Sequence, residues 1–319
     1  MNDNKIAVAF FGTSQRTSEI LDTLKDEFNL KFTVTKPDTR VGRDKITTQS
    51  GVKTWSVENS IPCYEVTDLK SSNAELILNK IREYKPKYIV VADFSYIVPE
   101  SLINNGQSTL INIHFSLLPK YRGASPVQFA VLNGDKVTGI TYQYLHKSMD
   151  KGDIIWQSEV EINPTETSGN LYERMFRIAA TEIATVLRNM EFGQLKTRAQ
   201  EENLATYTYS KNNSKTTQIL KEDAKLNWQN SNEHIYNAVR AYNPWPIAWT
   251  TLGEILSWKG LKTYELINNN HRNKKLQIIS ARYNRHSDEL ELTEVKIEGG
   301  NNTDYRSILN GYFKKTDKN

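Results

Sequence analysis

Short apolar runs alternate with amphipathic segments along residues 5–190, and this order constrains the fold more than any other feature of the sequence. Apolar or alternating stretches predict strands over residues 5–11, 32–35, 88–92, 110–114, 138–145 and 153–162. Apolar residues at helical spacing predict helices over residues 18–30, 73–84 and 168–190. Ser125 followed by Pro126 predicts the start of a further helix, with the Ser125 hydroxyl as its cap. Strands and helices in this order indicate an α/β sheet.

The pattern changes near residue 203. A polar cluster at residues 212–217 has no apolar period and predicts a linker or loop. A helical pattern over residues 233–242 follows, and then short strand patterns over 248–252, 275–282 and 290–297, separated by polar turns. The chain has 319 residues, which is enough for two domains at ~100–200 residues each. We therefore expect one domain at residues 1–204 and a smaller, β-rich, barrel-like domain at residues 205–319.

Composition excludes several classes of protein. The single cysteine, Cys63, rules out a disulfide framework and a thiolate zinc site. No apolar run approaches the roughly 20 residues of a membrane span, and residues 6–11 are too short for a signal peptide. We therefore expect a cytoplasmic protein that does not contact a membrane. Residues 206–319 carry 17 Lys and Arg against 12 Asp and Glu, which fits either a polyanionic partner or a merely solvated basic surface.

Three polar residues could together carry chemistry. Asn112 and His114 are two residues apart in a predicted strand, so their side chains share one face. Asp150 lies in a turn that contains Gly152. Taken separately, a polar strand end is more often a hydrogen-bonded pair, and a turn aspartate more often caps its own backbone. Together, an amide, an imidazole and a carboxylate are the groups that acyl transfer needs, as oxyanion donor, acid or base, and charged partner.

The surrounding sequence resembles the formyltransferase superfamily, which uses 10-formyltetrahydrofolate. The resemblance is carried by an ordered set of short motifs: Asn112-Ile113-His114, Ser116-Leu117-Leu118-Pro119, Tyr121-Arg122-Gly123 and Asp150-Lys151-Gly152-Asp153. It implies a Rossmann-like catalytic domain followed by an OB-like barrel, direct formyl transfer from 10-formyltetrahydrofolate as co-substrate, and no metal. It also implies catalytic roles for Asn112, His114 and Asp150.

Residues 36–43, with Lys45, look like the inserted loop of the branch of this superfamily that formylates initiator methionyl-tRNA. Residues 206–246 and 294–312 are similar to the second domain of that branch, which helps to hold the tRNA. The resemblance implies a monomer whose partners are initiator methionyl-tRNA and folate. The residues implied for tRNA are Arg40, Arg43, Lys45 and Arg122. The residues implied for folate are Phe94, Ser95, Ser116, Leu117, Leu118 and Pro119.

Several positions depart from the family pattern. Phe115 replaces a small residue or proline, and Asp93-Phe94-Ser95 stands where Ala-Tyr-Gly is common, so the backbone at Ser95 loses a glycine. Asp44 adds a negative charge to the proposed tRNA contact. Two other functions therefore stay open: a formyltransferase that acts on an amino-sugar nucleotide, and a protein that binds tRNA or folate without turnover.

Overall fold

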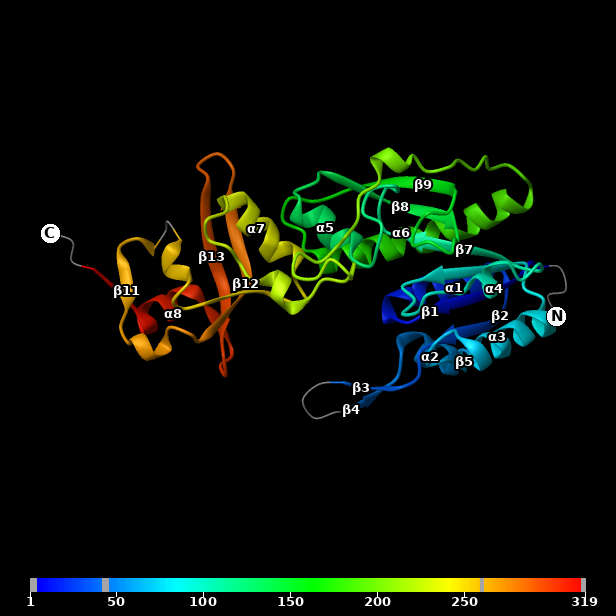
Figure 1. Cartoon of the computed structure of the whole chain (residues 1–319), viewed down its shortest axis with the longest axis horizontal. Helices are drawn as coiled ribbons and strands as arrows, with labels where there is room; N and C mark the ends of the chain where they lie inside the picture. The colour runs from blue at the N-terminus through cyan, green and yellow to red at the C-terminus, as the bar shows by residue number, and fades with distance from the viewer. Residues whose placement is uncertain (1–4, 42–45, 259–260, 317–319) are drawn as a thin grey trace. The chain divides into compact units, whose positions relative to one another are not determined.

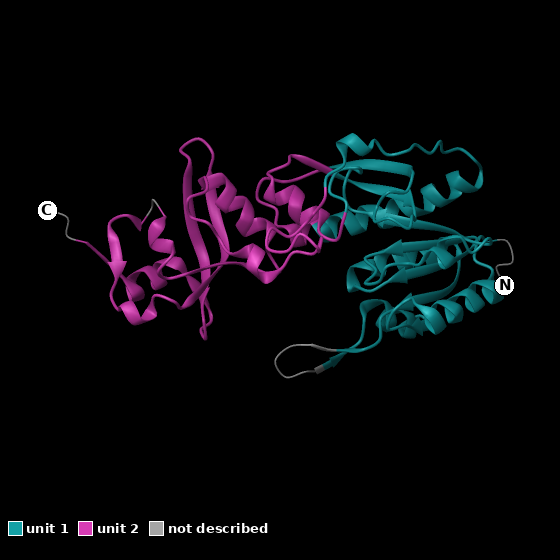
Figure 2. Ribbon diagram, in the orientation of Figure 1, with its two compact units in different colours: residues 1–122, 139–160, 172–206 teal, residues 123–138, 161–171, 207–319 magenta. Residues whose placement is uncertain are grey.

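The computed structural model describes residues 5–41, 46–258 and 261–316. The chain forms two compact units, each made of several segments. Unit 1 comprises residues 1–122, 139–160 and 172–206, and unit 2 comprises residues 123–138, 161–171 and 207–319 (Figure 2). The predicted boundary between residues 204 and 205 stays a prediction, and the segments 123–138 and 161–171 belong to the same unit as the C-terminal third of the chain.

Unit 1 is built on a seven-stranded sheet with the order β5-β2-β1-β6-β7-β8-β9 (Figure 1). Neighbouring strands from β5 to β7 pair in parallel, and β8 is antiparallel to β7. The strands are β1 (Ala7–Gly12), β2 (Asn29–Thr35), β5 (Cys63–Glu65), β6 (Tyr88–Ala92), β7 (Thr109–His114), β8 (Val137–Tyr144) and β9 (Ile154–Glu161). The predicted α/β sheet is therefore confirmed, and all six strands predicted in this region are present.

Every residue of β6 is buried, because a central parallel strand is covered on both faces. The helices of this region present apolar faces to the sheet, as in α3, where Ala74, Ile77 and Ile81 are buried. The longer helices are α1 (Ser18–Glu27), α2 (Gly51–Glu58), α3 (Ser71–Tyr84) and α6 (Ser168–Glu191), and α4 (Glu100–Ile103) is a single turn. Helices α1, α3 and α6 were predicted from the sequence, whereas α2 was missed.

The strand order reverses between β1 and β6. From β1 the chain moves outward through β2 to β5, whereas β6 leads to β7 on the other side. Gly12, the last residue of β1, pairs with Ala92, the last residue of β6. In open α/β sheets, ligands bind beyond the carboxyl ends of the strands at such a switch point. The loops that start at Thr13, Asp93 and Phe115 all leave the sheet at this edge.

Unit 2 contains two antiparallel ladders. A four-stranded sheet has the order β10-β12-β13-β14, and β11 pairs with β15. The strands are β10 (Ala248–Thr251), β11 (Tyr264–Leu266), β12 (Lys275–Asn284), β13 (Glu289–Ile297), β14 (Asn302–Asp304) and β15 (Phe313–Lys315). The helices are α5 (Pro126–Leu132), α7 (Asn232–Ala241) and α8 (Tyr305–Tyr312). A core formed largely by α7 and the strands also receives Phe129 and Leu132 of α5.

Two local predictions for unit 2 were wrong. Only strand patterns, over 248–252, 275–282 and 290–297, were predicted beyond residue 247, and a helix was missed: Tyr305 and Ile308 lie one turn apart on a buried helical face, which gives α8. Ser125 precedes α5 as expected, yet its hydroxyl does not cap the helix. The Ser125 Oγ instead accepts a hydrogen bond from the Ile219 N–H at 3.2 Å, so a tertiary contact has replaced the local one.

The segment at residues 36–45, which resembles the inserted loop, contains the first of two paired strands. Strand β3 (Thr39–Val41) pairs antiparallel with β4 (Ile46–Thr48). Arg40 lies in β3, and nothing is described of its side chain, whereas Arg43 and Lys45 lie outside the described residues. None of the helices in the described ranges combines the length and the apolar character needed to cross a bilayer.

Candidate active site

Strands β7 and β8 bring four polar side chains to one face of the sheet. Asn112 and His114 lie near the carboxyl end of β7. The antiparallel register places Gln143 opposite Asn112 and Thr141 opposite His114. Because directly paired residues point to the same face, the two amides, the imidazole and the hydroxyl form one polar surface at the ligand-binding edge of the sheet. The predicted side-by-side position of Asn112 and His114 is thus present in the structure.

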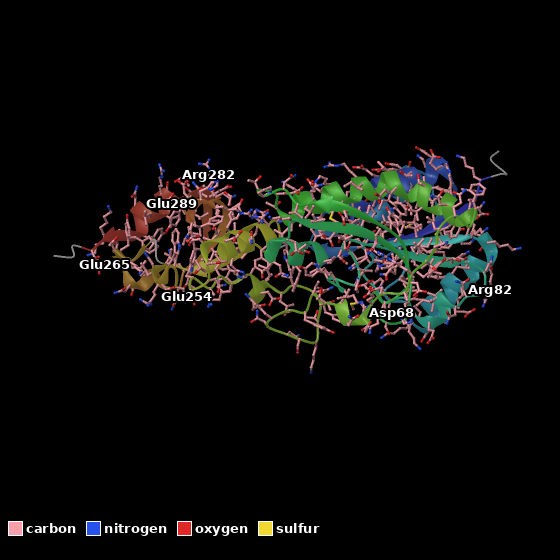
Figure 3. The ribbon with its side chains drawn as sticks, turned by 90° about the horizontal axis from the view of Figure 1, so that it is seen from above. Asp68, Arg82, Glu254, Glu265, Arg282 and Glu289 are labelled. Carbon is pink, nitrogen blue, oxygen red and sulfur yellow. The ribbon has the colours of Figure 1, made fainter. Side chains whose placement is uncertain are left out.

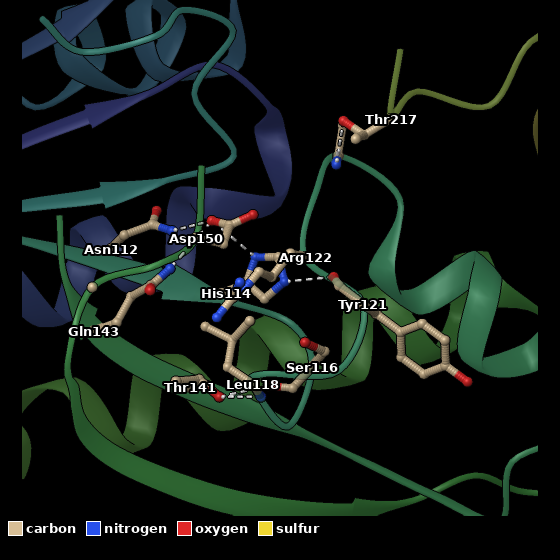
Figure 4. A network of polar contacts seen from close by, with 12 residues as sticks. Asn112, His114, Ser116, Leu118, Tyr121, Arg122, Thr141, Gln143, Asp150 and Thr217 are labelled. Atoms are coloured by element: carbon tan, nitrogen blue, oxygen red, sulfur yellow. Dashed lines mark hydrogen bonds and ion pairs between the residues drawn. The ribbon is translucent and has the colours of Figure 1, made fainter. Parts of the chain in front are cut away.

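The Asp150 carboxylate faces this surface (Figure 4). Its Oδ1 lies 3.2 Å from Gln143 Nε2, 3.5 Å from Asn112 Nδ2 and 3.6 Å from His114 Nδ1. The side chains of His114 and Asp150 are only 7% and 12% exposed, so their interaction is little screened by water. The three residues proposed from the sequence are therefore neighbours in space, although 36 to 38 residues separate Asp150 from the other two along the chain.

The second nitrogen of His114 has its own acceptor. His114 Nε2 lies 3.0 Å from the Tyr121 carbonyl oxygen, which can only accept, so Nε2 carries a hydrogen. A carbonyl oxygen and a carboxylate oxygen therefore face the two ring nitrogens, and only the imidazolium form donates to both. At 3.6 Å, the Nδ1 contact is longer than a direct hydrogen bond, which leaves this donor available to a third group.

The turn that carries Asp150 is held in place by its backbone. Asp150 has φ +53°, in the left-handed region that few residues adopt without support. Gln200 Nε2 donates to the Asp150 carbonyl at 2.7 Å and to the Gly152 carbonyl at 2.8 Å. A Cβ atom at Gly152 would lie 1.7 Å from the Tyr144 carbonyl oxygen, so only glycine fits there. These contacts fix the direction of the Asp150 carboxylate.

Arg122 holds the side-chain amide of Gln200 in place. Its Nε and Nη2 donate to Gln200 Oε1 at 3.1 and 2.9 Å, and its Nη1 lies 2.9 Å from Glu202 Oε2. The Arg122 side chain is 1% exposed. The sequence-based role of Arg122 in tRNA binding stays a prediction, and the observed contacts make Arg122 part of the support of Asp150. Gln143, Gln200 and Glu202 were missed, and only Gln143 had a detectable signal, as an inward position of the predicted strand 138–145.

The loop predicted to bind folate is tightly bonded to the sheet. Ser116 Oγ donates to the Lys120 carbonyl at 2.6 Å, and the Leu118 N–H donates to Thr141 Oγ1 at 3.2 Å. Gln157 Nε2 donates to the Leu118 carbonyl at 2.9 Å. This framework holds the loop against β8 and β9 beside His114. Roles for Ser116, Leu117, Leu118 and Pro119 in binding folate remain predictions.

The departures at residues 93–95 and 115 have structural explanations. Phe115 is buried, with its ring centroid 4.3 Å from that of Phe176 and 5.4 Å from that of Tyr172 on α6, so a large residue fills space there. In the loop after β6, positive φ occurs at Asp93, and Ser95 does not need it. The loss of a glycine at Ser95 therefore causes no backbone strain. Instead, the Ser95 N–H and hydroxyl both donate to Thr13 Oγ1, at 3.2 and 3.0 Å.

Comparison with known proteins assigns the chain to a family. The model of the formyl transferase family matches residues 4–187, and that of the formyl transferase C-terminal domain matches residues 218–312. A methionyl-tRNA formyltransferase from Bacillus cytotoxicus is 34% identical over 260 residues, which are 81% of this chain and 79% of that protein. The chain belongs to the methionyl-tRNA formyltransferase family. A second methionyl-tRNA formyltransferase, from Bacillus cereus, has the same identity and coverage.

Solved structures share the fold. The methionyl-tRNA formyltransferase from Clostridium thermocellum has a TM-score of 0.57 and 17% identity, and covers 92% of this chain and 100% of its own. A sugar N-formyltransferase from a Shewanella species has a TM-score of 0.56 and 20% identity, and covers 77% of this chain and 92% of its own. The predicted family, fold class and formyltransferase enzyme class are thus confirmed. Within the described ranges, no three His, Cys, Asp or Glu side chains form a cluster suited to a metal ion.

Proposed function

We propose that this chain transfers the formyl group of 10-formyltetrahydrofolate to the amino group of initiator methionyl-tRNA. The observation that supports this most strongly is the convergence of Asn112, His114 and Asp150 on one partly enclosed site at the ligand edge of the sheet. The 34% identity to methionyl-tRNA formyltransferases along 81% of the chain supports the choice of acceptor.

The reaction would proceed by direct attack. The neutral amine of the methionyl group forms a bond to the formyl carbon, and the carbonyl electron pair moves to the formyl oxygen. The second N–H of the Asn112 amide and the His114 imidazolium then donate to this oxyanion. The Asp150 carboxylate, directly or through one water, accepts the proton that the amine loses. When the carbonyl re-forms, the bond to N10 of tetrahydrofolate breaks, and N10 leaves with the proton that Asp150 accepted, transferred directly or through the same water. No covalent enzyme intermediate is involved.

The long contacts around Asp150 suit this sequence. The distances of 3.5 Å to Asn112 Nδ2 and 3.6 Å to His114 Nδ1 leave both donors weakly engaged. An oxyanion placed between them would gain hydrogen bonds that the resting site does not make, which stabilises the transition state more than the ground state. Donors of this kind typically contribute ~2.7–4 kcal/mol each.

The partners follow from the same proposal. The loop at Ser116–Pro119, with Phe94 and Ser95, would bind the folate. Arg40, Arg43 and Lys45 on the β3–β4 segment would contact the tRNA, together with the domain at residues 205–319. This reaction requires no metal, and the chain would act as a cytoplasmic monomer.

The amino-sugar nucleotide remains the second candidate acceptor, because a sugar N-formyltransferase shares the fold. The test is a formylation assay. The intact protein and 10-formyltetrahydrofolate are mixed with one of three acceptors: initiator methionyl-tRNA, elongator methionyl-tRNA, or a 4-amino-sugar nucleotide. We expect formyl transfer to the initiator tRNA alone. Transfer to the sugar nucleotide alone would indicate a sugar N-formyltransferase. The absence of formyl transfer to all three acceptors would indicate a binding protein without turnover.

A further inference from the structure

Arg16 lies at the switch point of the unit 1 sheet, four residues after the end of β1. Arg16 lies in a short 3-10 helix, η1 (Gln15–Thr17). The segment between β1 and this turn is tied to the loop after β6, because the Thr13 hydroxyl accepts hydrogen bonds from Ser95. Both loops leave the sheet beyond the carboxyl ends of its strands, where substrates of α/β proteins bind. Arg16 therefore lies at the edge of the sheet where a substrate of an α/β protein binds.

The guanidinium of Arg16 has no counter-ion in the part of the chain that the structure describes. It lies 5.5 Å from the centroid of the Tyr172 ring, and neither a hydrogen bond nor an ion pair satisfies its nitrogens. Two other arginines of unit 1 differ in this respect. Arg82, at the surface in Figure 3, lies 3.0 Å from Glu75, and Arg122 lies 2.9 Å from Glu202. Arg16 is half-buried, so water replaces the missing partner only in part.

Tyr172, on α6, holds this arginine at the same edge of the sheet. Its ring packs edge-on against Phe115, which directly follows His114, with 5.4 Å between the ring centroids. Among the described residues, no group forms a hydrogen bond with the Tyr172 hydroxyl. Burial raises the pKa of this hydroxyl, and so do the negative charges of Asp93 and Asp150, whereas the charge of Arg16 lowers it. The phenol is thus a neutral donor within the field of both carboxylates and of the guanidinium.

We propose that Arg16 and the Tyr172 hydroxyl form a subsite for an anionic oxygen of a bound substrate. A guanidinium without a counter-ion, oriented by an aromatic face, binds a carboxylate or phosphate through charge-assisted hydrogen bonds. Asp93 and Asp150 would otherwise repel an anion at this edge, and Arg16 supplies the compensating charge. The inference rests on the proposed function, which offers two sources of such an oxygen: a phosphate of the tRNA acceptor end and a glutamate carboxylate of the folate.

Binding measured without turnover tests the inference. Dissociation constants would be determined for charged initiator tRNA, for tetrahydrofolate, and for a tetrahydropteroyl amide that lacks the glutamate. The variant is Arg16→Gln. The matched control is Arg177→Gln, which removes an exposed arginine on the same helix as Tyr172. Both variants should keep the wild-type Tm within about 2 °C, because neither guanidinium forms an ion pair in the described structure.

We expect Arg16→Gln to weaken one ligand about 10- to 100-fold, as the loss of a charged hydrogen bond predicts, and Arg177→Gln to change none by more than about twofold. A loss confined to the tRNA assigns a phosphate, and the salt dependence of tRNA binding should then fall by about one unit of slope. A loss confined to tetrahydrofolate assigns the glutamate carboxylate. Tyr172→Leu, which removes the ring under Arg16, should reproduce part of the same loss.

Two results would overturn the inference. One is equal affinity of wild type and Arg16→Gln for all three ligands. The other is a loss that extends to the neutral tetrahydropteroyl amide, because this would report a distorted folate pocket and not a missing charge. If the wild-type protein binds neither tRNA nor folate, the proposed function fails as well, and that outcome is distinct from binding by wild type that Arg16→Gln leaves unchanged.

Discussion

At the scale of single residues, the candidate active site depends on side chains, such as Gln200, that fix the orientation of the proposed catalytic side chains. Asn112, His114 and Asp150 could be predicted as a group because two share a strand face and all three belong to recognisable motifs. Gln200 could not be predicted, because its role comes from two backbone carbonyls, at 2.7 and 2.8 Å, that a sequence does not display. Arg122 was predicted from the sequence to bind tRNA. Its contacts with Gln200 and Glu202 could not be predicted, because the burial of an arginine in a motif cannot be inferred from its neighbours in sequence.

Gln200 is expected to be a positioning residue. Gln200→Ala removes both hydrogen bonds that hold the Asp150 turn, and a displacement of about 1 Å at a reacting group can cost up to about 100-fold in rate. We predict that kcat falls about 10-fold or more while KM for both substrates stays within about twofold. Gln194→Ala, an exposed glutamine on the same segment, is the control. A rise in KM at constant kcat would place Gln200 in substrate binding instead.

At the scale of helices, strands and loops, tertiary contacts determine the local structure where the sequence pattern is short or polar. Long apolar patterns gave the central strands and the helices α1, α3, α6 and α7 because burial dictates both their period and their structure. The short helix α8 was missed because only one turn of its apolar face is fully buried. The polar residues 212–217 were predicted to form a loop. In the structure, Asn212 of this segment and the neighbouring Ser210 both donate hydrogen bonds to the buried carboxylate of Asp223.

Asp223 predicts an acid-sensitive contribution to stability. Its side chain is 3% exposed and accepts hydrogen bonds from Ser210, Asn212 and the Leu220 N–H. Burial raises the pKa of this carboxyl, and the hydrogen bonds together lower it by more, so its pKa lies below 3.8. A folded-state pKa that is lowered adds stability above pH 3.8, and this stability is lost as the pH falls through the folded-state value.

We expect Asp223→Asn to lower the free energy of unfolding at pH 7 by at least about 1 kcal/mol. The difference from wild type should shrink as the pH falls below about 4, because the wild-type carboxyl is then protonated too. Denaturant unfolding between pH 3 and pH 7 measures both effects. Glu222→Gln, on the same 3-10 turn but exposed, is the control. A difference between wild type and Asp223→Asn that is independent of pH would contradict the assignment.

At the scale of the whole molecule, the two units are interleaved along the chain. Residues 123–138 and 161–171 lie within the first predicted domain but belong to unit 2. The sequence predicts one boundary, because the pattern of strands and helices changes at one place along the chain. Which segments pack together cannot be inferred from that pattern. Helix α5 illustrates this, since its Phe129 and Leu132 pack on a core built from residues beyond 218.

This arrangement predicts the behaviour of a truncated chain. A fragment of residues 1–204 would lose the core against which Phe129 and Leu132 pack, and exposed apolar surface of this kind promotes association. We expect the fragment to bind the dye ANS and to aggregate at concentrations at which the full chain does not aggregate. Size-exclusion chromatography with light scattering compares the two. A monomeric fragment that binds no dye would show that the boundary at residue 204 separates independent domains.

The central claim is that Asn112, His114 and Asp150 carry formyl transfer to methionyl-tRNA. The most direct test is the single-turnover rate of N-formylmethionyl-tRNA formation, with saturating 10-formyltetrahydrofolate and initiator methionyl-tRNA, for wild type, His114→Ala and Asp150→Ala. We predict measurable formyl transfer by the wild type and rates about 10²- to 10⁴-fold lower in each variant. The Tm of each variant should equal that of the wild type, because the fold is retained. Variants that transfer the formyl group at nearly the wild-type rate would contradict the account.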